Sequence, residues 1–359
     1  MKEQRKQIIL FSNKIFHYRI QIYNYFVGYF EKNGYDFKVI APLIDRNLKH
    51  LIKFDLIETN YSLINAKKIF TMIYNEDPHT VIFFFHLKDL IYWPIVLLCK
   101  AFSISIIYWN HGVNMQDPNN KIKHIFHNFM HSISDKLILY SKNELKYISN
   151  KNRNKVVIAP NTINFNEIPN IQTTKKQIRN KFGISKNKIA LFVGRISPEK
   201  RVNYLIDIFK DSRLSDYLLV IVGNNLSQSL IKHVKQSNNI VYYDQIIDTI
   251  IINEIFKMSD IFVHPGAIGL SLNQAFYWGL PVITENVLHH PEIIYLKNNK
   301  NGFIVQCNEK NDFIEKIQLL FTNTELLKQF SKSAQDTILK EANIDLMANG
   351  FVTGFNTLK

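Results

Sequence analysis

The stretch HPGAIGLSLNQAFYWGLPVITE, residues 264–285, decides the fold of this chain. It predicts the end of a buried strand, a loop with two glycines, an amphipathic helix and then a second strand. The backbone N–H groups at the start of such a helix have no partner within the helix and attract anions. The loop and the first helical turns contain no carboxylate. The stretch therefore predicts an anion site that lacks acidic side chains.

Short β-branched or aromatic runs alternate with helical patterns along the chain up to the end of this stretch. Such alternation is typical of parallel strands that are buried on both faces and joined by helices. The predicted strands are residues 7–11, 37–41, 81–85, 104–108, 136–140 and 155–159 in the first half, and 188–193, 217–222, 239–243, 260–263 and 280–284 in the second. We therefore expect an α/β fold with two doubly wound, Rossmann-like domains that face each other across a cleft.

A chain of 359 residues is longer than one hydrophobic core usually serves. Residues 160–177 are polar, contain two prolines and show no sustained period, as a connection between domains would. We expect one domain at residues 1–165, a second at 166–342, and a C-terminal segment, 343–359, that is partly helical and can return to the first domain.

The formal net charge is +14 and is unevenly distributed. Residues 1–165 contain 22 Lys and Arg against 12 Asp and Glu, which gives +10, and the remaining 22 against 18 give +4. This asymmetry favours a partner with phosphates, such as an anionic lipid surface, a nucleotide-linked substrate or a nucleic acid. The alternative is that Lys is abundant because the genome is AT-rich. The basic residues are dispersed and match no nucleic-acid-binding motif, so we expect no nucleic acid partner.

We expect neither a signal peptide nor a membrane-spanning helix in this sequence. The apolar run near the start is too short for a signal peptide, and the most hydrophobic segment, 91–109, is interrupted by Pro94 and Lys100, which favours a packed helix followed by a strand. Cys99 and Cys307 are far apart, and neither suggests a disulfide or a zinc site. We expect a cytoplasmic protein.

A second candidate site follows the predicted strand at 188–193. There, GRISPEKRVNYLIDIF (194–209) provides Gly194 for a tight exit from the strand, with Arg195 and Lys200 at the start of the next helix, which we expect to begin at Ser197 or Pro198. A guanidinium and an ammonium beside the positive end of a helix form a strong diphosphate site. The alternative is an ordinary solvated helix start.

These motifs resemble those of a known family. GRISPEKRVNYLI and the stretch 260–285 are similar to the two signatures of the family 4 retaining glycosyltransferases of the GT-B fold, bacterial surface-polysaccharide type. Residues 291–305 and 155–165 resemble two further segments of that family. The resemblance covers most of the second domain strongly and the first domain weakly.

The resemblance implies an activity. It implies an acceptor-side first domain, a second domain that binds a nucleotide sugar, and transfer from a nucleoside-diphosphate sugar to a hydroxyl of a glycan, lipid-linked, in lipopolysaccharide or capsule synthesis. The implied hexosyltransferase reaction retains the sugar's configuration and uses no metal or cofactor. Arg195, Lys200 and His111 would be the catalytic residues.

The second signature departs from the family, which usually has two Glu residues there. Alignment places Gly266 at the first Glu and Gln274 at the second. The family's second Glu holds the nucleotide ribose, which an amide can also do. Backbone N–H groups of Gly269, Leu270 and Ser271 can still bind a phosphate. Recognition of the sugar by the first Glu must be replaced from elsewhere.

Candidate residues in the first domain follow predicted strands. His111 lies in an HG turn, which in the family often contacts the donor sugar; a packed histidine or a loop histidine is the alternative. His17 and Arg19 follow the first strand, where an acceptor or a phosphate could bind, although the glycine pair common in this loop of the family is missing.

A run of three histidines, His124, His127 and His131, lies on one side of a predicted helix. Metal ligation is conceivable, but no carboxylate or Cys completes a set, so we expect no metal site. We expect instead that this helix shapes the cleft or meets the membrane.

Two alternative functions remain open beside the enzyme. The missing acids could mark a non-catalytic GT-B subunit or scaffold of a glycosylation complex, and the charge could mark a nucleic-acid binder. For the enzyme, the basic first domain predicts peripheral binding to the anionic inner face of the cytoplasmic membrane.

Overall fold

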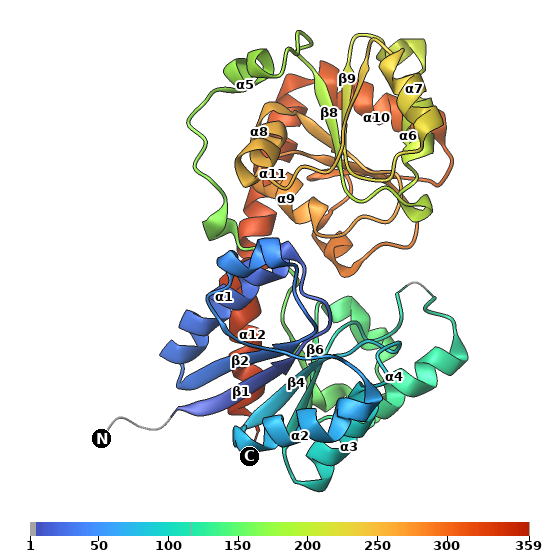
Figure 1. Cartoon of the computed structure of the whole chain (residues 1–359). Helices are drawn as coiled ribbons and strands as arrows, with labels where there is room; N and C mark the ends of the chain where they lie inside the picture. The colour runs from blue at the N-terminus through green and yellow to red at the C-terminus, as the bar shows by residue number, and fades with distance from the viewer. Residues whose placement is uncertain (1–4, 116, 359) are drawn as a thin grey trace. The chain divides into compact units, whose positions relative to one another are not determined.

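The computed structural model describes residues 5–115 and 117–358, which form two compact units (Figure 1). The first unit contains the described parts of 1–164 and 343–359, and the second unit contains residues 165–342. Each unit is an α/β layer structure built on one parallel sheet.

The sheet of the first unit has seven parallel strands in the order β3-β2-β1-β4-β5-β6-β7. Its strands are β1 (Lys6–Phe11), β2 (Tyr35–Ala41), β3 (Asp55–Glu58), β4 (Thr80–Phe84), β5 (Ser105–Trp109), β6 (Lys136–Leu139) and β7 (Val156–Ile158). Its α-helices are α1 (His17–Lys32), α2 (Ala66–Asn75), α3 (Tyr92–Ala101), α4 (Lys121–Ile133) and α12 (Ile344–Asn356). The strand order reverses between β1 and β4, and such a switch point is where open α/β sheets bind ligands, outside the carboxyl ends of the strands.

Both faces of this sheet are buried, which explains why its strands are continuous apolar runs. Ile8 and Leu10 of β1 pack into the core formed with α1 and α12, whereas Ile9 and Phe11 pack into the core formed with α2 and α3. All four side chains are fully buried. Because successive side chains of a strand point to opposite faces of the sheet, β1 contributes apolar side chains to both cores.

The end of the chain belongs to the first unit. In Figure 1, α12, drawn in red, lies against the blue and green elements of this unit. The ring of Phe351 lies 4.8 Å from that of Trp109 and 4.9 Å from that of Phe26. A side chain at Gly350 would meet the carbonyl oxygen of Ile158, so glycine lets α12 approach the sheet closely.

The sheet of the second unit has six parallel strands in the order β10-β9-β8-β11-β12-β13. They are β8 (Ile189–Val193), β9 (Leu218–Val222), β10 (Ile240–Tyr243), β11 (Ile261–Val263), β12 (Val282–Glu285) and β13 (Gly302–Val305). The α-helices are α5 (Lys175–Lys181), α6 (Val202–Phe209), α7 (Gln228–Lys235), α8 (Thr249–Met258), α9 (Ser271–Tyr277), α10 (Lys310–Thr322) and α11 (Thr324–Glu341).

The predicted α/β class with two doubly wound, Rossmann-like domains is confirmed. All eleven predicted strands are present within one or two residues of their expected ends. Two strands were not predicted, β3 and β13, and both lie at the edge of their sheets.

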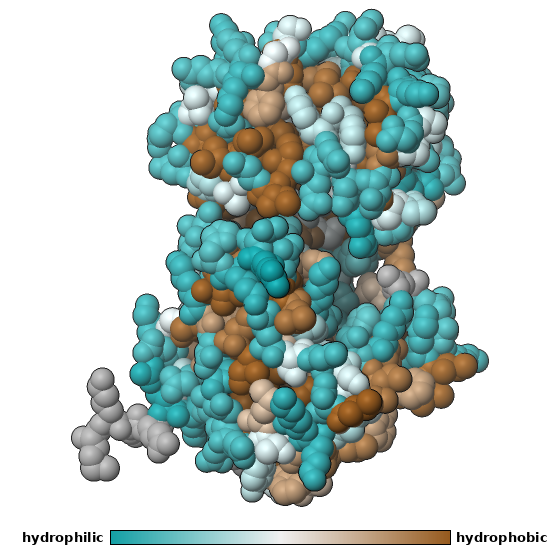
Figure 2. Space-filling view, in the orientation of Figure 1, coloured by the Kyte–Doolittle hydropathy of each residue, from teal (hydrophilic) through white to brown (hydrophobic). Residues whose placement is uncertain are grey.

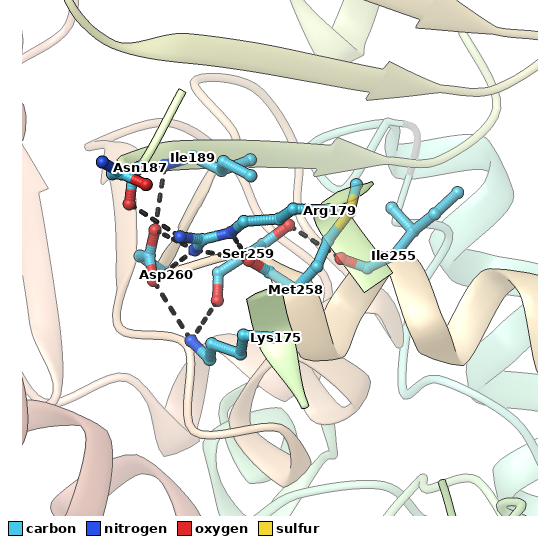
Figure 3. A network of polar contacts seen from close by, with 8 residues as sticks. All are labelled: Lys175, Arg179, Asn187, Ile189, Ile255, Met258, Ser259 and Asp260. Atoms are coloured by element: carbon cyan, nitrogen blue, oxygen red, sulfur yellow. Dashed lines mark hydrogen bonds and ion pairs between the residues drawn. The ribbon is translucent and has the colours of Figure 1, made fainter. Parts of the chain in front are cut away.

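A polar network fixes α5 to the amino ends of β8 and β11 (Figure 3). The Asp260 carboxylate accepts bonds from both Nη2 of Arg179, at 2.8 Å, and the backbone N–H of Ile189, at 2.9 Å. Lys175 completes it, donating to Asp260 and to the carbonyl oxygen of Ser259. This network lies at the end of the sheet opposite to the loops that carry the candidate site.

Candidate functional site

The loop after β8 does not lead directly into an α-helix. A single 3₁₀ turn, Pro198–Lys200, follows the strand, and Arg201 then adopts a left-handed conformation with φ of 56° before α6 begins at Val202. The expected start at Ser197 or Pro198 is therefore the start of the 3₁₀ turn, whereas the α-helix begins only at Val202. The reason is the Arg201 conformation, which breaks the helical path and which non-glycine residues rarely adopt.

Several contacts hold Arg201 in this conformation. Its Nε lies 2.7 Å from the Glu285 carboxylate, which is fully buried at the end of β12, and its Nη2 donates to Asn308 at 2.6 Å. Its guanidinium also lies over the Tyr204 ring. Because the buried Glu285 is neutralised by Arg201, that carboxylate is not available to a ligand.

Lys200 joins this turn to the loop that precedes α9. Its Nζ donates to the carbonyl oxygen of Ala267, and the N–H of Ala267 donates in return to the carbonyl oxygen of Glu199, at 2.8 Å. Burial lowers the pKa of Lys200, and the nearby Arg195 lowers it further. A bound anion would favour the charged ammonium.

Gly266 packs directly against the same turn. A Cβ at this position would lie 2.1 Å from the carbonyl oxygen of Glu199 and 2.7 Å from Cα of Lys200. No side chain fits there unless one of the two loops moves. The carboxylate that is missing at residue 266 is thus excluded by backbone packing, which the sequence alone could not reveal.

Arg195 and the start of α9 have hydrogen-bond donors that no group in the described chain accepts from. Arg195 is exposed, and within residues 5–115 and 117–358 its guanidinium makes no hydrogen bond or ion pair. The backbone N–H groups of Gly269, Leu270 and Ser271 likewise have no hydrogen-bond acceptor in that part of the chain. These donors therefore remain available to an anion.

Gln274 is half-buried on α9 and is held by α8. Its Nε2 donates to Oδ1 of Asn253 at 3.1 Å, and the indole N–H of Trp278 donates to the same oxygen at 2.8 Å. This leaves the Gln274 carbonyl oxygen as an acceptor for a hydroxyl.

Two histidines near this site were not singled out from the sequence. His264, fully buried against the Phe192 ring, has a pKa well below its usual range because of burial. His289 accepts from the N–H of Ile268 at 3.2 Å and donates to the carbonyl oxygen of Glu285 at 2.8 Å, and burial lowers its pKa as well. Both rings contact the backbone of the loops. Nothing in their spacing distinguishes them from other histidines of the chain.

In the first unit, His111 follows β5 and is held by a carboxylate. Its Nδ1 lies 2.9 Å from Oε1 of Glu144, which is buried, while Oε2 of Glu144 accepts from the N–H groups of Tyr140 and Ser141. The carboxylate fixes the orientation of the imidazole ring, as in sites where a histidine is positioned for a ligand. Glu144 was missed because it lies 33 residues away in the sequence.

The two other first-unit candidates differ in burial. Arg19 is buried, and its Nη2 donates to the Tyr140 hydroxyl at 3.3 Å, which links it to the residues around His111. His17 is exposed at the first position of α1, with its ring edge-on to Tyr18 at 5.7 Å. The structure brings Arg19 and His111 together through Tyr140, whereas His17 takes no part in these contacts.

The three histidines of α4 do not form a metal site. His127 and His131 are buried against Tyr108, and burial lowers their pKa to about 4 and about 3. Within the described ranges no group of three His, Cys, Asp or Glu could hold a metal ion.

Comparison with known proteins finds a family match in the second unit. Residues 174–337 match the family model of the glycosyl transferases group 1. They include the loop after β8, the loop before α9 and α9 itself. This part of the chain is thus similar to the domain that the family model describes.

The other comparisons cover different extents of the chain. An uncharacterized 41.2 kDa protein in the cps region of Klebsiella pneumoniae is 29% identical over 167 residues, 45% of this chain and 45% of that protein. The chain spans about half the length of several curated relatives that it matches.

Solved glycosyltransferase structures share the fold of the whole chain. A glycosyltransferase from Rickettsia africae has a TM-score of 0.78 at 20% identity, covering 99% of this chain and 98% of that chain. Anabaena Alr3699/HepE in complex with UDP has a TM-score of 0.77 at 14% identity, covering 98% and 100%. The chain thus has the GT-B type of architecture, with two Rossmann-like domains.

Proposed function

We propose that this chain is a glycosyltransferase that moves a sugar from a nucleoside-diphosphate donor to a hydroxyl of a glycan, with retention of configuration. The observation that carries the proposal is the set of unused hydrogen-bond donors in the second unit, whose residues 174–337 match the family model of the glycosyl transferases group 1. Arg195, the half-buried Lys200 and the backbone N–H groups of 269–271 all lie in the segments that follow β8 and β11, between each strand and the first turn of the next α-helix. The UDP bound to Anabaena HepE supports a nucleotide as the ligand.

The proposed chemistry requires charge stabilisation. The bond between the sugar C1 and the β-phosphate oxygen breaks, the acceptor oxygen bonds to C1 on the same face, and the acceptor's proton passes to the departing phosphate. Arg195 and Lys200 would stabilise the negative charge that develops on the diphosphate. This arrangement can act without a divalent ion, because two cations and several N–H groups supply the same electrostatic effect.

Other residues would orient the ligands. Gln274 would accept a hydrogen bond from the ribose through its free carbonyl oxygen, in place of the family's Glu. His111, oriented by Glu144, would contact the transferred sugar. Arg19 would contact the acceptor.

The alternative is a non-catalytic subunit of a glycosylation complex. This alternative is suggested by the two missing acids. The packing of Gly266, however, explains why residue 266 cannot be a Glu, and the hydrogen-bond donors proposed to bind the phosphate are still present. A scaffold would bind no nucleotide sugar or would bind it without turnover.

Turnover measurements test this proposal. The chain should hydrolyse or transfer sugar from one of a panel of UDP, GDP, ADP and TDP sugars, in the presence of EDTA. Arg195→Ala or Lys200→Ala should lower kcat at least about a hundredfold with the fold intact. Near-normal kcat in both variants, or strict dependence on added Mn²⁺ or Mg²⁺, would contradict the mechanism.

We also propose that the first unit binds an anionic membrane surface, where a lipid-linked acceptor would be found. No helix among residues 5–115 and 117–358 is long and apolar enough to cross a membrane. An exposed apolar face on α4, formed by Ile122, Ile125, Phe126 and Phe129, supports surface binding. Figure 2 shows hydrophobic surface in this region of the first unit.

A further inference from the structure

Arg19 is a buried cation without a counter-ion. Its side chain is only 6% exposed, and a guanidinium stays charged at any physiological pH. Its Nη2 donates to the Tyr140 hydroxyl, but Nη1 is buried and has no hydrogen-bond partner within the described chain. No carboxylate of that part of the chain forms an ion pair with Arg19. A buried charge in this situation costs free energy unless a partner arrives.

The surroundings of Arg19 do not neutralise it. The guanidinium carbon lies 4.6 Å from the Phe84 ring and 4.8 Å from the Trp109 ring, so aromatic faces cover it on the protein side. Burial raises the pKa of Tyr140, which therefore remains a neutral phenol. Cation–π contacts offset part of the cost of burying the charge, but they leave the N–H of Nη1 unsatisfied.

The one buried carboxylate in this cluster, Glu144, is already committed. Its oxygens accept from His111 and from the N–H groups of Tyr140 and Ser141. The cluster therefore offers donors from Arg19, and from the Tyr140 hydroxyl, which keeps its own proton after accepting from Arg19. A group that has several acceptor oxygens and a negative charge matches this set.

Arg19 also lies where a ligand is expected. Phe84 is the last residue of β4 and Trp109 is the last residue of β5, and Arg19 itself follows β1. The strand order of the sheet reverses between β1 and β4. The guanidinium therefore covers the carboxyl ends of the strands at the switch point, where open α/β sheets bind their ligands.

We propose that Arg19 and Tyr140 bind a phosphate group of the acceptor, so that the acceptor of this enzyme is a phosphate-bearing molecule. The assignment of the ligand as an acceptor rests on the proposed function, whereas the phosphate site itself is inferred from the buried guanidinium of Arg19. Arg19 keeps its charge in the core of the first unit because the ligand supplies the counter-ion.

The test uses the full chain and calorimetric titration of inorganic phosphate in a phosphate-free buffer. The titration is performed with the Arg195→Ala variant, which lacks the main cation of the proposed diphosphate site in the second unit. Adding Arg19→Met should weaken phosphate binding at least about tenfold, whereas Arg19→Lys should weaken it less, because the charge remains. Tyr140→Phe should weaken it about threefold or more through the loss of one donor. Unchanged phosphate affinity in the Met variant would overturn the proposal.

Stability without ligand separates a binding role from a structural one. If Arg19 serves a ligand, then Arg19→Met removes an uncompensated charge, and the Tm of the unliganded chain should stay within about 2 °C of the parent or rise. A Tm lowered by more than about 6 °C would show that Arg19 is a packing residue and would overturn the proposal.

Titration of UDP distinguishes the acceptor's phosphate from the donor's. Arg19→Met in the otherwise unchanged chain should alter UDP affinity less than about twofold, whereas Arg195→Ala should weaken it strongly. Equal losses of phosphate and UDP affinity in Arg19→Met would assign the site to the donor and overturn the acceptor assignment. If neither the parent chain nor any variant bound UDP, the proposed function would be rejected. The phosphate titration would still test the role of Arg19.

Discussion

Gly266 shows how one residue without a side chain can determine the chemistry of a loop. Its backbone touches the turn that carries Lys200, and a Cβ would lie 2.1 Å from the carbonyl oxygen of Glu199. Gly266→Ala must therefore displace Lys200 relative to the loop before α9. We expect nucleotide affinity to fall at least about tenfold and stability to fall by about 1–3 kcal/mol, the usual cost of overpacking. Calorimetric titration and thermal unfolding measure both.

Gly28 provides the matched control for this prediction. It lies within α1, and a Cβ there would meet nothing within 4 Å. Gly28→Ala should raise stability by up to about 1 kcal/mol, because alanine favours the helix, and should leave nucleotide binding unchanged. If Gly266→Ala behaves like Gly28→Ala, the two loops are not coupled as the structure indicates.

Glu144 is the second residue whose role depends on a contact. Glu144→Gln preserves size and can still accept from the N–H groups of Tyr140 and Ser141, but it removes the charge that orients His111. We expect kcat to fall about tenfold or more with little change in Tm, since the ring would lose its fixed orientation. His111→Ala should lower kcat as much, and the double variant should lower it no further. Additive losses would show that the two residues act separately.

At the scale of elements, the strands were predictable and the turns between them were not. Continuous apolar runs such as those of β1 and β8 predict buried strands, because helices cover both faces of a parallel sheet. The break at Arg201 depends instead on Glu285 and Asn308, which are distant in the sequence. The same is true of Glu144 beside His111. The sequence located the candidate loops through strand ends, but the partners that shape them come from other elements.

The contacts that fix α5 permit a prediction at this scale. Asp260→Ala would leave Arg179 and the N–H of Ile189 without their acceptor, so we expect a loss of about 2–3 kcal/mol in the free energy of unfolding. Because the network lies at the amino ends of β8 and β11, UDP affinity measured below the unfolding transition should stay within about twofold of the parent. A large loss of UDP affinity in a folded variant would place the network in the binding site. Asp216→Ala, at an exposed residue whose side chain makes no hydrogen bond or ion pair within the described chain, serves as the control.

At the scale of the whole molecule, charge and apolar exposure coincide in the first unit. Residues 1–165 carry +10 of the total of +14. On α4, Ile122 and Ile125 are 68% and 65% exposed, whereas the opposite side of this helix buries Met130 and two histidines. Lys121 and Lys123 flank the apolar face. A helix with this distribution is suited to lie in a membrane interface, with apolar side chains inserted and basic side chains near the headgroups.

The last prediction follows from that distribution. The chain should sediment with anionic vesicles at low salt, because each Lys or Arg near the surface contributes about 1 kcal/mol, and binding should fall at least about tenfold in about 0.5 M NaCl. Ile122→Ser with Ile125→Ser should leave the chain in the supernatant even at low salt, since the apolar contribution is lost. Ile247→Ser with Ile250→Ser changes two similarly exposed residues of the second unit and should sediment like the parent. If both double variants sediment equally, the apolar face of α4 is not the membrane contact. If binding to the vesicles persists in about 0.5 M NaCl, the basic charge of the first unit is not what drives it.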